Sequence, residues 1–305
     1  MYIGIDVGGT NLKAGLVDGE GNILKVERVP LDFHGPEAFA KTLAELSKKV
    51  MQESVRWAGI GLPGAVDGGD VLFTTNIPME NVPLERLFRQ HLDLPLLLGN
   101  DADCAAVGEF FRGAGKGTQD FAVVTLGTGV GAGLILNGRL RGGVTSSEAG
   151  HMVVCQGGEP CNCGRLGCWE RYASATGLIQ QTRRAMEAHP ESLLHEIAAS
   201  GNGVEGRTAF QAAEAGDETA LAVCREYVNY LAGGLVSLIN ILRPEVVAIG
   251  GGVAAAPVHL LMEPLREAVV AECFSRHGGR ATRILPAELG NDAGIIGAAL
   301  LGRVL

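Results

Sequence analysis

The sequence is poor in aromatic residues and has no excess of basic ones. Phe, Trp and Tyr make up 5% of its 305 residues, and 25 lysines and arginines face 34 aspartates and glutamates, which gives a net charge of −9. An acidic chain is a poor partner for nucleic acid. It can still bind a nucleotide, because backbone amides and Mg²⁺ neutralise phosphates locally.

The chain also lacks the apolar segments that membranes and export require. No uninterrupted apolar run approaches the roughly 18 residues of a membrane-spanning helix. The first residues, Met1–Asp6, read as a strand and not as a charged leader before an apolar stretch. We therefore expect a cytoplasmic protein with no membrane partner. In that setting seven cysteines, an odd number, favour free thiols or metal binding over disulfides.

Glycine and short apolar segments are abundant, with 45 glycines and 47% hydrophobic residues, and the length suffices for two domains. The hydrophobic pattern predicts strands over residues 2–6, 12–17, 23–29, 58–62, 94–98, 121–126, 133–136, 246–249 and 283–286. It predicts helices over residues 36–50, about 101–111, 174–186, 208–215, 219–242, 258–272 and 291–305. Residues 113–118, rich in glycine, are expected to form a linker. The alternation of strands and helices indicates an α/β protein.

One motif occurs twice, about 120 residues apart: a strand, a glycine turn and a second strand. Taken alone, either turn is more typical of a simple hairpin, but two at corresponding places favour phosphate binding, because successive amides in a tight turn form an anion site. The candidates in the first turn are Asp6, Gly8, Gly9, Thr10, Asn11 and Lys13. Those in the second are Gly127, Thr128, Gly129 and Gly131. A third run, Gly250, Gly251 and Gly252, follows a strand and either admits a nucleoside or only turns the chain.

Asn100 and Asp101 follow a buried strand and open a helix. One interpretation is helix capping, since Asn at the N-cap and Asp in the first turn are common there. The other is catalytic: Asp101 accepts a proton from an attacking hydroxyl, and Asn100 orients the same substrate. The motif alone does not decide between them.

The most distinctive segment holds one histidine and three cysteines within 18 residues, His151, Cys161, Cys163 and Cys168. These are enough to close a tetrahedral zinc site. Two carboxylates, Glu148 and Glu170, bracket it, so the metal would fix groups suited to holding sugar hydroxyls. A purely structural zinc loop is the alternative, and a disulfide is less favoured. We expect both glycine turns to lie away from the cysteines, and therefore expect nucleotide binding to stay nearly intact when the metal is lost.

Together these motifs make the chain resemble the ROK family (repressors, open reading frames and sugar kinases) of the actin-like ATPase clan. The resemblance covers essentially the whole chain. It rests on the segments DVGGTN from Asp6, GLPG from Gly61, NDA from Asn100, GTGVG from Gly127, EAGH from Glu148, and the cysteine box that ends at Glu170. It implies two actin-like (ribonuclease H-like) α/β domains, each with a mixed five-stranded sheet, around a central cleft. We expect an N-terminal domain over residues 1–115, on which the helix 291–305 packs, and a C-terminal domain over 116–290.

The resemblance also implies a role for each motif. Asp101 is expected to be the general base for the 6-hydroxyl of a hexose. The implied sugar contacts are Gly64, Asn76, Asn100, Asp101, Glu148, His151 and Glu170. The glycine turns imply the ATP phosphate sites, residues 250–252 the adenosine site, and His151 with the three cysteines the zinc ligands. Mg²⁺ is expected to bridge the terminal phosphates of ATP.

The activity that this implies is transfer of the γ-phosphoryl group of ATP to glucose. Kinases for N-acetylglucosamine, N-acetylmannosamine or another hexose are the alternative within the family. A sugar-responsive repressor is disfavoured, since those relatives carry a DNA-binding domain ahead of the first phosphate strand. The expected partners are the hexose, ATP and a second or further copies of the chain, as a homodimer or homotetramer.

Overall fold

The computed structural model describes residues 1–75, 77–142 and 146–305. Two compact units make up the chain: Met1–Val123 with Ala132–Ser147 and Ala287–Leu305 form the first, and Val124–Gly131 with Glu148–Pro286 form the second. Within the described ranges, no helix combines the length and apolar character needed to cross a bilayer.

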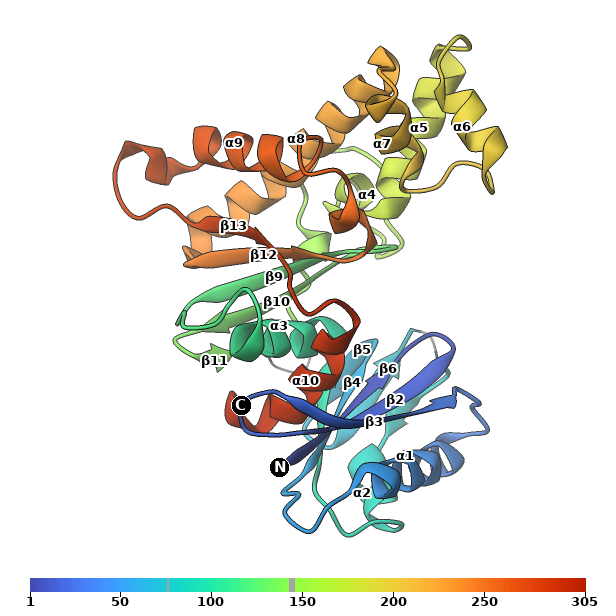
Figure 1. Cartoon of the computed structure of the whole chain (residues 1–305), viewed down its shortest axis with the longest axis vertical. Coiled ribbons are helices and arrows are strands. Elements are labelled where there is room, and N and C mark those ends of the chain that lie inside the picture. The colour runs from blue at the N-terminus through green and yellow to red at the C-terminus, as the bar shows by residue number, and fades with distance from the viewer. Residues whose placement is uncertain (76, 143–145) are drawn as a thin grey trace. The chain divides into compact units, whose positions relative to one another are not determined.

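The first unit is built on a mixed five-stranded sheet in the order β3-β2-β1-β4-β8 (Figure 1). Its strands are β1 (Tyr2–Val7), β2 (Asn11–Val17), β3 (Ile23–Pro30), β4 (Ala58–Leu62) and β8 (Leu96–Asn100). β1 pairs antiparallel with β2 and parallel with β4, and β4 pairs parallel with β8. The predicted strands are confirmed within about two residues. β8 runs from 96 to 100 instead of 94 to 98, so it ends directly at Asn100.

Helices cover this sheet on both sides. They are α1 (Pro36–Val50), α2 (Leu84–Arg89), α3 (Asp101–Arg112) and α10 (Ala293–Leu300). α10 lies against β1 and β4, far from them in sequence. The approach is close because a Cβ on Gly4 or Gly59 would fall within 2 Å of a backbone carbonyl oxygen of α10. The α-helix, Ala293–Leu300, is shorter than the predicted range 291–305, and Leu301–Arg303 continue it as a 3₁₀ turn.

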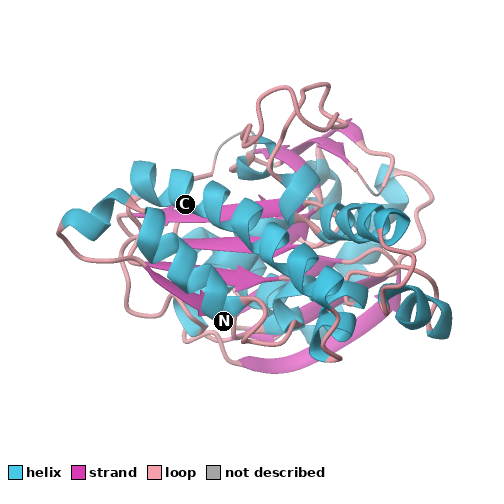
Figure 2. Ribbon diagram, turned by 90° about the horizontal axis from the view of Figure 1, so that it is seen from above, coloured by secondary structure: helices cyan, strands magenta, loops and turns pink. Residues whose placement is uncertain are grey.

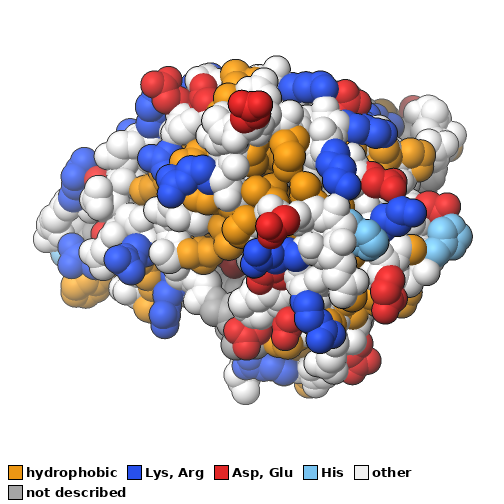
Figure 3. Space-filling model, turned by 90° about the horizontal axis from the view of Figure 1, so that it is seen from below, with side chains coloured by type: hydrophobic (Ala, Val, Ile, Leu, Met, Phe, Trp, Pro, Cys, Tyr) orange, Lys and Arg blue, Asp and Glu red, His pale blue; other side chains and the backbone are white. Residues whose placement is uncertain are grey.

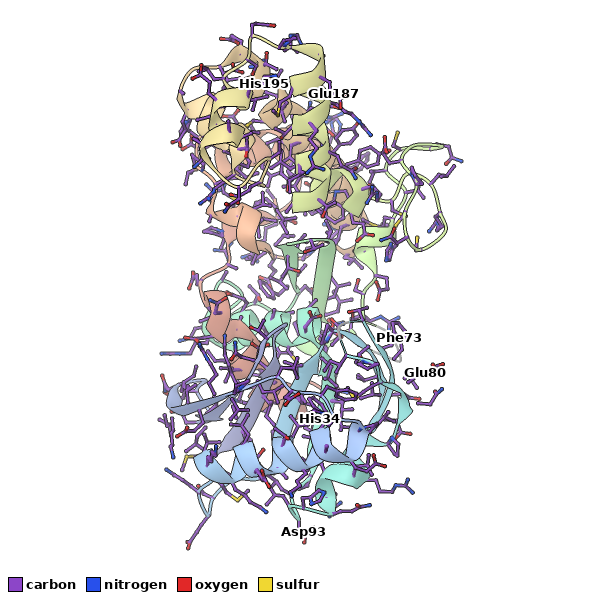
Figure 4. All side chains as sticks on the ribbon, turned by 90° about the vertical axis from the view of Figure 1, so that its right-hand side faces the viewer. His34, Phe73, Glu80, Asp93, Glu187 and His195 are labelled. Atoms are coloured by element: carbon purple, nitrogen blue, oxygen red, sulfur yellow. The ribbon has the colours of Figure 1, made fainter. Side chains whose placement is uncertain are left out.

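A small antiparallel sheet that the sequence did not predict follows β4. Its strands are β5 (Gly64–Asp67), β6 (Asp70–Thr74) and β7 (Glu80–Val82). Phe73 in the central strand and Glu80 in β7 are cross-strand partners, and both are exposed; their side chains are labelled in Figure 4. Gly64 pairs with Thr74, and a Cβ on Gly64 would lie 2.1 Å from the Phe73 carbonyl oxygen, so close strand pairing requires glycine here.

The second five-stranded sheet has the order β11-β10-β9-β12-β13, which repeats the topology of the first. Its strands are β9 (Phe121–Leu126), β10 (Val130–Leu136), β11 (Arg139–Leu140), β12 (Val246–Gly250) and β13 (Arg283–Pro286). Asn137 and Gly138 both have positive φ in the β10–β11 hairpin, which confirms the turn that the Asn-Gly pair predicts. Each copy of the strand–turn–strand motif thus begins one of two sheets with the same topology.

The remaining helices follow the sequence pattern with three exceptions. They are α4 (Glu170–Ala173), α5 (Ala175–Ala188), α6 (Leu194–Ser200), α7 (Thr208–Glu214), α8 (Glu218–Leu242) and α9 (Met262–Glu272). The short helices α4 and α6 were not predicted, and α9 begins four residues later than expected. In Figures 1 and 2 helices cover strands of this sheet, and α9 contacts β13.

Residues 113–118 form a packed turn, so the linker interpretation was wrong. Ala114 and Thr118 are buried, and the Ala114 N–H donates to a carboxylate oxygen of Glu109 at 3.0 Å. The other oxygen of Glu109 accepts from the N–H groups of Glu288 and Leu289 at 2.9 and 2.8 Å. Glu109 is 1% exposed, and three backbone donors compensate its burial.

Replacing Glu109 by glutamine should destabilise the protein although the shape is unchanged. The amide NH₂ would face one of the three N–H donors, and a buried donor without an acceptor costs about 1–3 kcal/mol. Urea unfolding should show a loss of this size, and none for Glu267→Gln, an exposed position in α9. Equal stability of the two variants would refute the role given to the carboxylate.

Candidate functional site

The first glycine turn joins β1 to β2 as predicted. The Gly8 N–H donates to the Asn11 carbonyl oxygen at 3.0 Å, while Gly9 and Thr10 are exposed. The Asn11 side chain donates to the Thr10 hydroxyl at 2.8 Å. The turn is thus ordered, and the amides of Gly9 and Thr10 are accessible to a ligand, as an anion site requires.

Asp6 lies at the end of β1, beside this turn. Its carboxylate is 4.0 Å from the Lys13 ammonium, and an added Cβ on Gly294, in the first turn of α10, would lie 2.8 Å from it. Burial raises the pKa of Asp6, and Lys13 offsets only part of that effect. A cation bound here would favour the ionised carboxylate.

Asp6→Asn should therefore stabilise the ligand-free protein at neutral pH. The pKa of Asp6 in the folded protein lies above the ordinary value of 3.8, so ionisation of this carboxyl opposes folding. The loss of stability is fully present at pH values above the folded pKa and absent below pH 3.8. The variant should melt at a higher temperature than the wild type at pH 7, and the difference should shrink as the pH falls towards 3.8. Asp67→Asn, an exposed site in the same unit, should show no such trend. A less stable Asp6→Asn at pH 7 would contradict the assignment.

Asn100 and Asp101 lie where β4 and β8 end side by side. The Asn100 side chain accepts from the Ala102 N–H at 2.8 Å and donates to the Gly64 carbonyl oxygen at 3.0 Å. Capping by Asn100 is therefore confirmed, and it fixes Gly64 beside the start of the helix.

Asp101 is exposed at the first position of α3. A carboxylate there is accessible to substrate, and its role as the general base stays a prediction. Asn76 lies outside the described residues.

The second glycine turn joins β9 to β10 and is held by the start of α5. The Gly127 N–H donates to the Gly129 carbonyl oxygen at 3.1 Å, and the Ala175 N–H donates to the Gly127 carbonyl oxygen at 2.8 Å. The Thr176 hydroxyl donates to the Thr128 carbonyl oxygen at 2.8 Å. Space is open around Gly127, where an added Cβ would meet nothing within 4 Å.

A cavity of about 620 Å³ brings this turn together with the third glycine run. Gly127 and Thr128 line one part of it and Gly252 another. Gly251 has φ +85° and lies so close to β9 that a Cβ would fall 2.5 Å from the Leu126 carbonyl oxygen. The turn after β12 therefore needs glycine for its conformation and its packing.

Sequence reasoning missed the remaining wall of this cavity. It includes Glu205, Arg207, Phe210, Gln211, Glu214 and Pro257. Arg207 pairs with Glu205 at 2.8 Å, and Phe210 is buried. A mostly apolar cavity with a few polar groups is typical of a small-molecule site. These residues form no short motif, so no sequence signal pointed to them.

The histidine and three cysteines do come together. One ligand atom from each of His151, Cys161, Cys163 and Cys168 lies within 4.8 Å of the other three. Cys161 Sγ is 3.6 Å from His151 Nδ1, and Cys163 Sγ is 3.6 Å from Cys168 Sγ. Tetrahedral zinc, with bonds of about 2.0–2.3 Å, separates its ligand atoms by about 3.5–3.8 Å. The residues therefore fit a zinc ion.

The thiols of this cluster differ in acidity. Burial raises the pKa of Cys161 to about 12 and also raises that of Cys168. The backbone N–H of Arg165 lowers the pKa of Cys163. A divalent cation among the sulfurs would favour the thiolate form at all three, as metal ligation requires.

Two carboxylates flank the histidine of the cluster. Glu170 Oε1 is 3.1 Å from Cys161 Sγ and 3.7 Å from His151 Nδ1, while Glu148 Oε2 is 3.8 Å from His151 Nε2. The Glu148 side chain is 60% exposed, which leaves its oxygens open to a ligand. Nδ1 thus faces the thiols and Nε2 faces away from them.

The expectation that both glycine turns lie away from the cluster was wrong for the second turn. An added Cβ on Gly129 would lie 2.7 Å from Glu170 Oε2. Glu170 therefore touches the cluster with one oxygen and the turn with the other. The sequence could not indicate this contact, because 41 positions of chain separate Gly129 from Glu170.

Comparison with known proteins agrees with the motifs. The model of the ROK family matches residues 2–304. The chain belongs to the ROK family. A glucokinase from Thermotoga maritima is 38% identical over 305 residues, which cover 97% of this chain and 95% of the relative. A glucokinase from Halalkalibacterium halodurans is 36% identical over 313 residues, with coverages of 98% and 94%.

A solved ROK family structure matches equally completely. It is the glucokinase of Streptomyces griseus in complex with glucose and AMPPNP, with 36% identity, a TM-score of 0.79 and 99% of each chain covered. The two-domain actin-like fold of the family is therefore the fold of this chain.

The ROK motifs divide between the two units. The first holds Asp6, the first glycine turn, Gly64, Asn100 and Asp101; the second holds the second glycine turn, the cavity of about 620 Å³ and the cysteine cluster. On the face in Figure 3, acidic and basic side chains are interspersed among apolar ones. That face offers no single-signed field of the kind that steers a polyanion.

Proposed function

We propose that this protein is an ATP-dependent kinase that phosphorylates the 6-hydroxyl of a hexose, with glucose as the main substrate. One observation carries the proposal. The second glycine turn and Gly252 share a nucleoside-sized cavity, in a chain that matches a glucokinase solved with glucose and AMPPNP over 99% of its length.

The nucleotide is assigned to the glycine turns and the cavity. Its base and ribose occupy the cavity beside Gly252 and Phe210, where most of the wall is apolar. Its phosphates meet the backbone amides of the two turns, which neutralise charge without a Walker lysine. Phosphoryl transfer depends mainly on such positioning and charge compensation.

Asp6 is the group that would hold Mg²⁺ in this chain. Its carboxylate adjoins the first glycine turn, and its burial disfavours the ionised form unless a cation compensates. When bound, Mg²⁺ neutralises negative charge on the terminal phosphates of ATP.

The acceptor sugar is assigned to Asp101 and to the polar residues around the zinc cluster. Asp101 takes the proton of the 6-hydroxyl as that oxygen attacks, and Asn100 orients the same part of the sugar beside Gly64 and Asn76. Glu148, His151 and Glu170 hold the other hydroxyls. His151, Cys161, Cys163 and Cys168 would bind Zn²⁺, which fixes the backbone between Glu148 and Glu170.

Two further assignments complete the proposal. Residues 1–115 with 291–305 form the domain of the base, and 116–290 form the domain of the cluster. The protein works in the cytoplasm, where ATP and hexose are supplied, as a homodimer or homotetramer.

ADP release tests the proposal across glucose, mannose, fructose, N-acetylglucosamine and N-acetylmannosamine, each with ATP and Mg²⁺. Glucose should give the highest kcat/KM. An N-acetylhexosamine as the best substrate would keep the kinase and overturn the choice of sugar. ADP release that no sugar stimulates would overturn the kinase.

A further inference from the structure

The second glycine turn, Gly127–Gly129, and the start of β10 are contacted by residues adjacent in sequence to the cysteine-cluster ligands. We propose that the cluster, through Glu170 and Gly150, positions this turn and so sets affinity for the phosphoryl donor as well as for the sugar. The proposal rests on the proposed function, in which the turn binds nucleotide phosphates. Its new element is the coupling between the cluster and the donor site.

Glu170 is the first contact. It begins α4, two residues after the cluster ligand Cys168, and its side chain is only 22% exposed. Oε1 is 3.1 Å from Cys161 Sγ, and Oε2 faces Gly129, where an added Cβ would lie 2.7 Å away. Among the described residues other than Gly129 and its two chain neighbours, the one further atom within 4 Å of that Cβ is Glu170 Cδ. A shift of the Glu170 carboxylate therefore changes the packing against Gly129 directly.

Gly150 is the second contact. It precedes the cluster ligand His151 in a short 3₁₀ helix, Ala149–His151. An added Cβ on Gly150 would lie 2.2 Å from the carbonyl oxygen of Val130, the first residue of β10, which directly follows Gly129 of the turn. The backbone beside His151 is thus packed against the backbone at the exit of the turn with no room for a side chain.

The backbone that leads from the cluster to Glu170 is firmly anchored. Trp169 is fully buried; its backbone N–H donates to the Met152 carbonyl oxygen at 2.7 Å and its indole N–H to the Tyr230 carbonyl oxygen at 2.9 Å. The chain enters α5 five residues after α4 begins, and the first residues of α5 donate hydrogen bonds to the carbonyl oxygens of Gly127 and Thr128. One short stretch of chain therefore connects the cluster to both sides of the turn.

The first test measures AMPPNP affinity by calorimetry without sugar. Gly129→Ala places a methyl group against Glu170 and not in open space, so it should displace the turn and raise Kd about 3- to 10-fold, the effect of about one hydrogen bond. Gly233→Ala is the matched control, since an added Cβ there meets nothing within 4 Å. It should leave Kd unchanged.

A double-mutant cycle identifies Glu170 as the route. In a Glu170→Ala background the methyl group at position 129 has room, so Gly129→Ala should change Kd much less than it does in the wild type. An effect of the same size in both backgrounds would show that the methyl group acts on the nucleotide itself, and would overturn the proposal.

The metal is tested at Cys163, because Cys161 contacts Glu170 directly. Cys163→Ser should lose zinc by elemental analysis and raise the AMPPNP Kd about 3- to 10-fold. Cys155→Ser, at a cysteine in the same loop outside the cluster, should keep both zinc and affinity. Should Cys163→Ser fail to fold, the Gly129–Glu170 cycle still decides, because it removes no metal ligand.

These outcomes separate the inference from the proposed function. A wild-type protein that does not bind AMPPNP would refute the proposed function. A wild type that binds, with a zinc-free Cys163→Ser that binds equally well, would refute only the coupling.

Discussion

Replacing Asp101 by asparagine is expected to lower kcat at least about 100-fold, the usual scale for losing a general base. Asparagine keeps the size of the side chain and can still accept from the Ala102 N–H, the contact that Asp101 makes at 2.9 Å. It cannot take a proton from the sugar. The KM for glucose should change much less than kcat.

Steady-state ADP release at saturating ATP measures this effect. Asp93→Asn, at a side chain 92% exposed and labelled in Figure 4, is the matched control and should keep wild-type kcat. If Asp101→Asn retained more than about a tenth of wild-type kcat, Asp101 would not be the base, and Asp103 in the same helix would be the next carboxylate to test.

Cys161→Ser is expected to be the second most damaging change. The serine hydroxyl is a poor zinc ligand, so the metal should be lost, while the large apolar core keeps the chain folded. The segment from Glu148 to Glu170 should then loosen. Misplacing positioning groups by about 1 Å can cost about 100-fold in rate. We expect a raised KM for glucose, a lowered kcat and, unlike the expectation from sequence, weaker nucleotide binding.

Zinc content, sugar kinetics and nucleotide affinity are measured on the same preparation. Cys273→Ser, at a buried thiol far along the chain in unit two and outside the cluster, controls for loss of a cysteine as such. Absence of zinc from the wild type, or normal sugar phosphorylation by a zinc-free variant, would show that the cluster does not position the sugar ligands.

Periodicity predicted the main elements well because their burial is regular. α1 has the predicted bounds, with Phe39, Leu43, Leu46 and Val50 buried on one face. β4 is apolar throughout and β9 is apolar except for Thr125, and both are likewise placed without error. The β5–β7 sheet was missed because its strands are three to five residues long and their burial does not alternate regularly. Its register depends on pairing with neighbours, which one strand's sequence does not encode.

The site was predictable where chemistry is concentrated in a short motif. The four metal-ligand candidates converge as their spacing suggested, and the glycine turns occupy equivalent places in the two sheets. The wall formed by Arg207, Phe210 and Glu214 was not predictable, since ordinary helix residues acquire that role only through tertiary packing. The contact between Gly129 and Glu170 was missed for the same reason.

The position of the phosphate on the product tests the central assignment most directly. Glucose is incubated with the protein, ATP and Mg²⁺, and the product is examined by phosphorus–proton correlation NMR. We expect the phosphorus to couple to the two protons on carbon 6, and the signal to be absent with Asp101→Asn over the same time. Coupling to a proton on another carbon, or no phosphorylated sugar, would contradict a hexose 6-kinase.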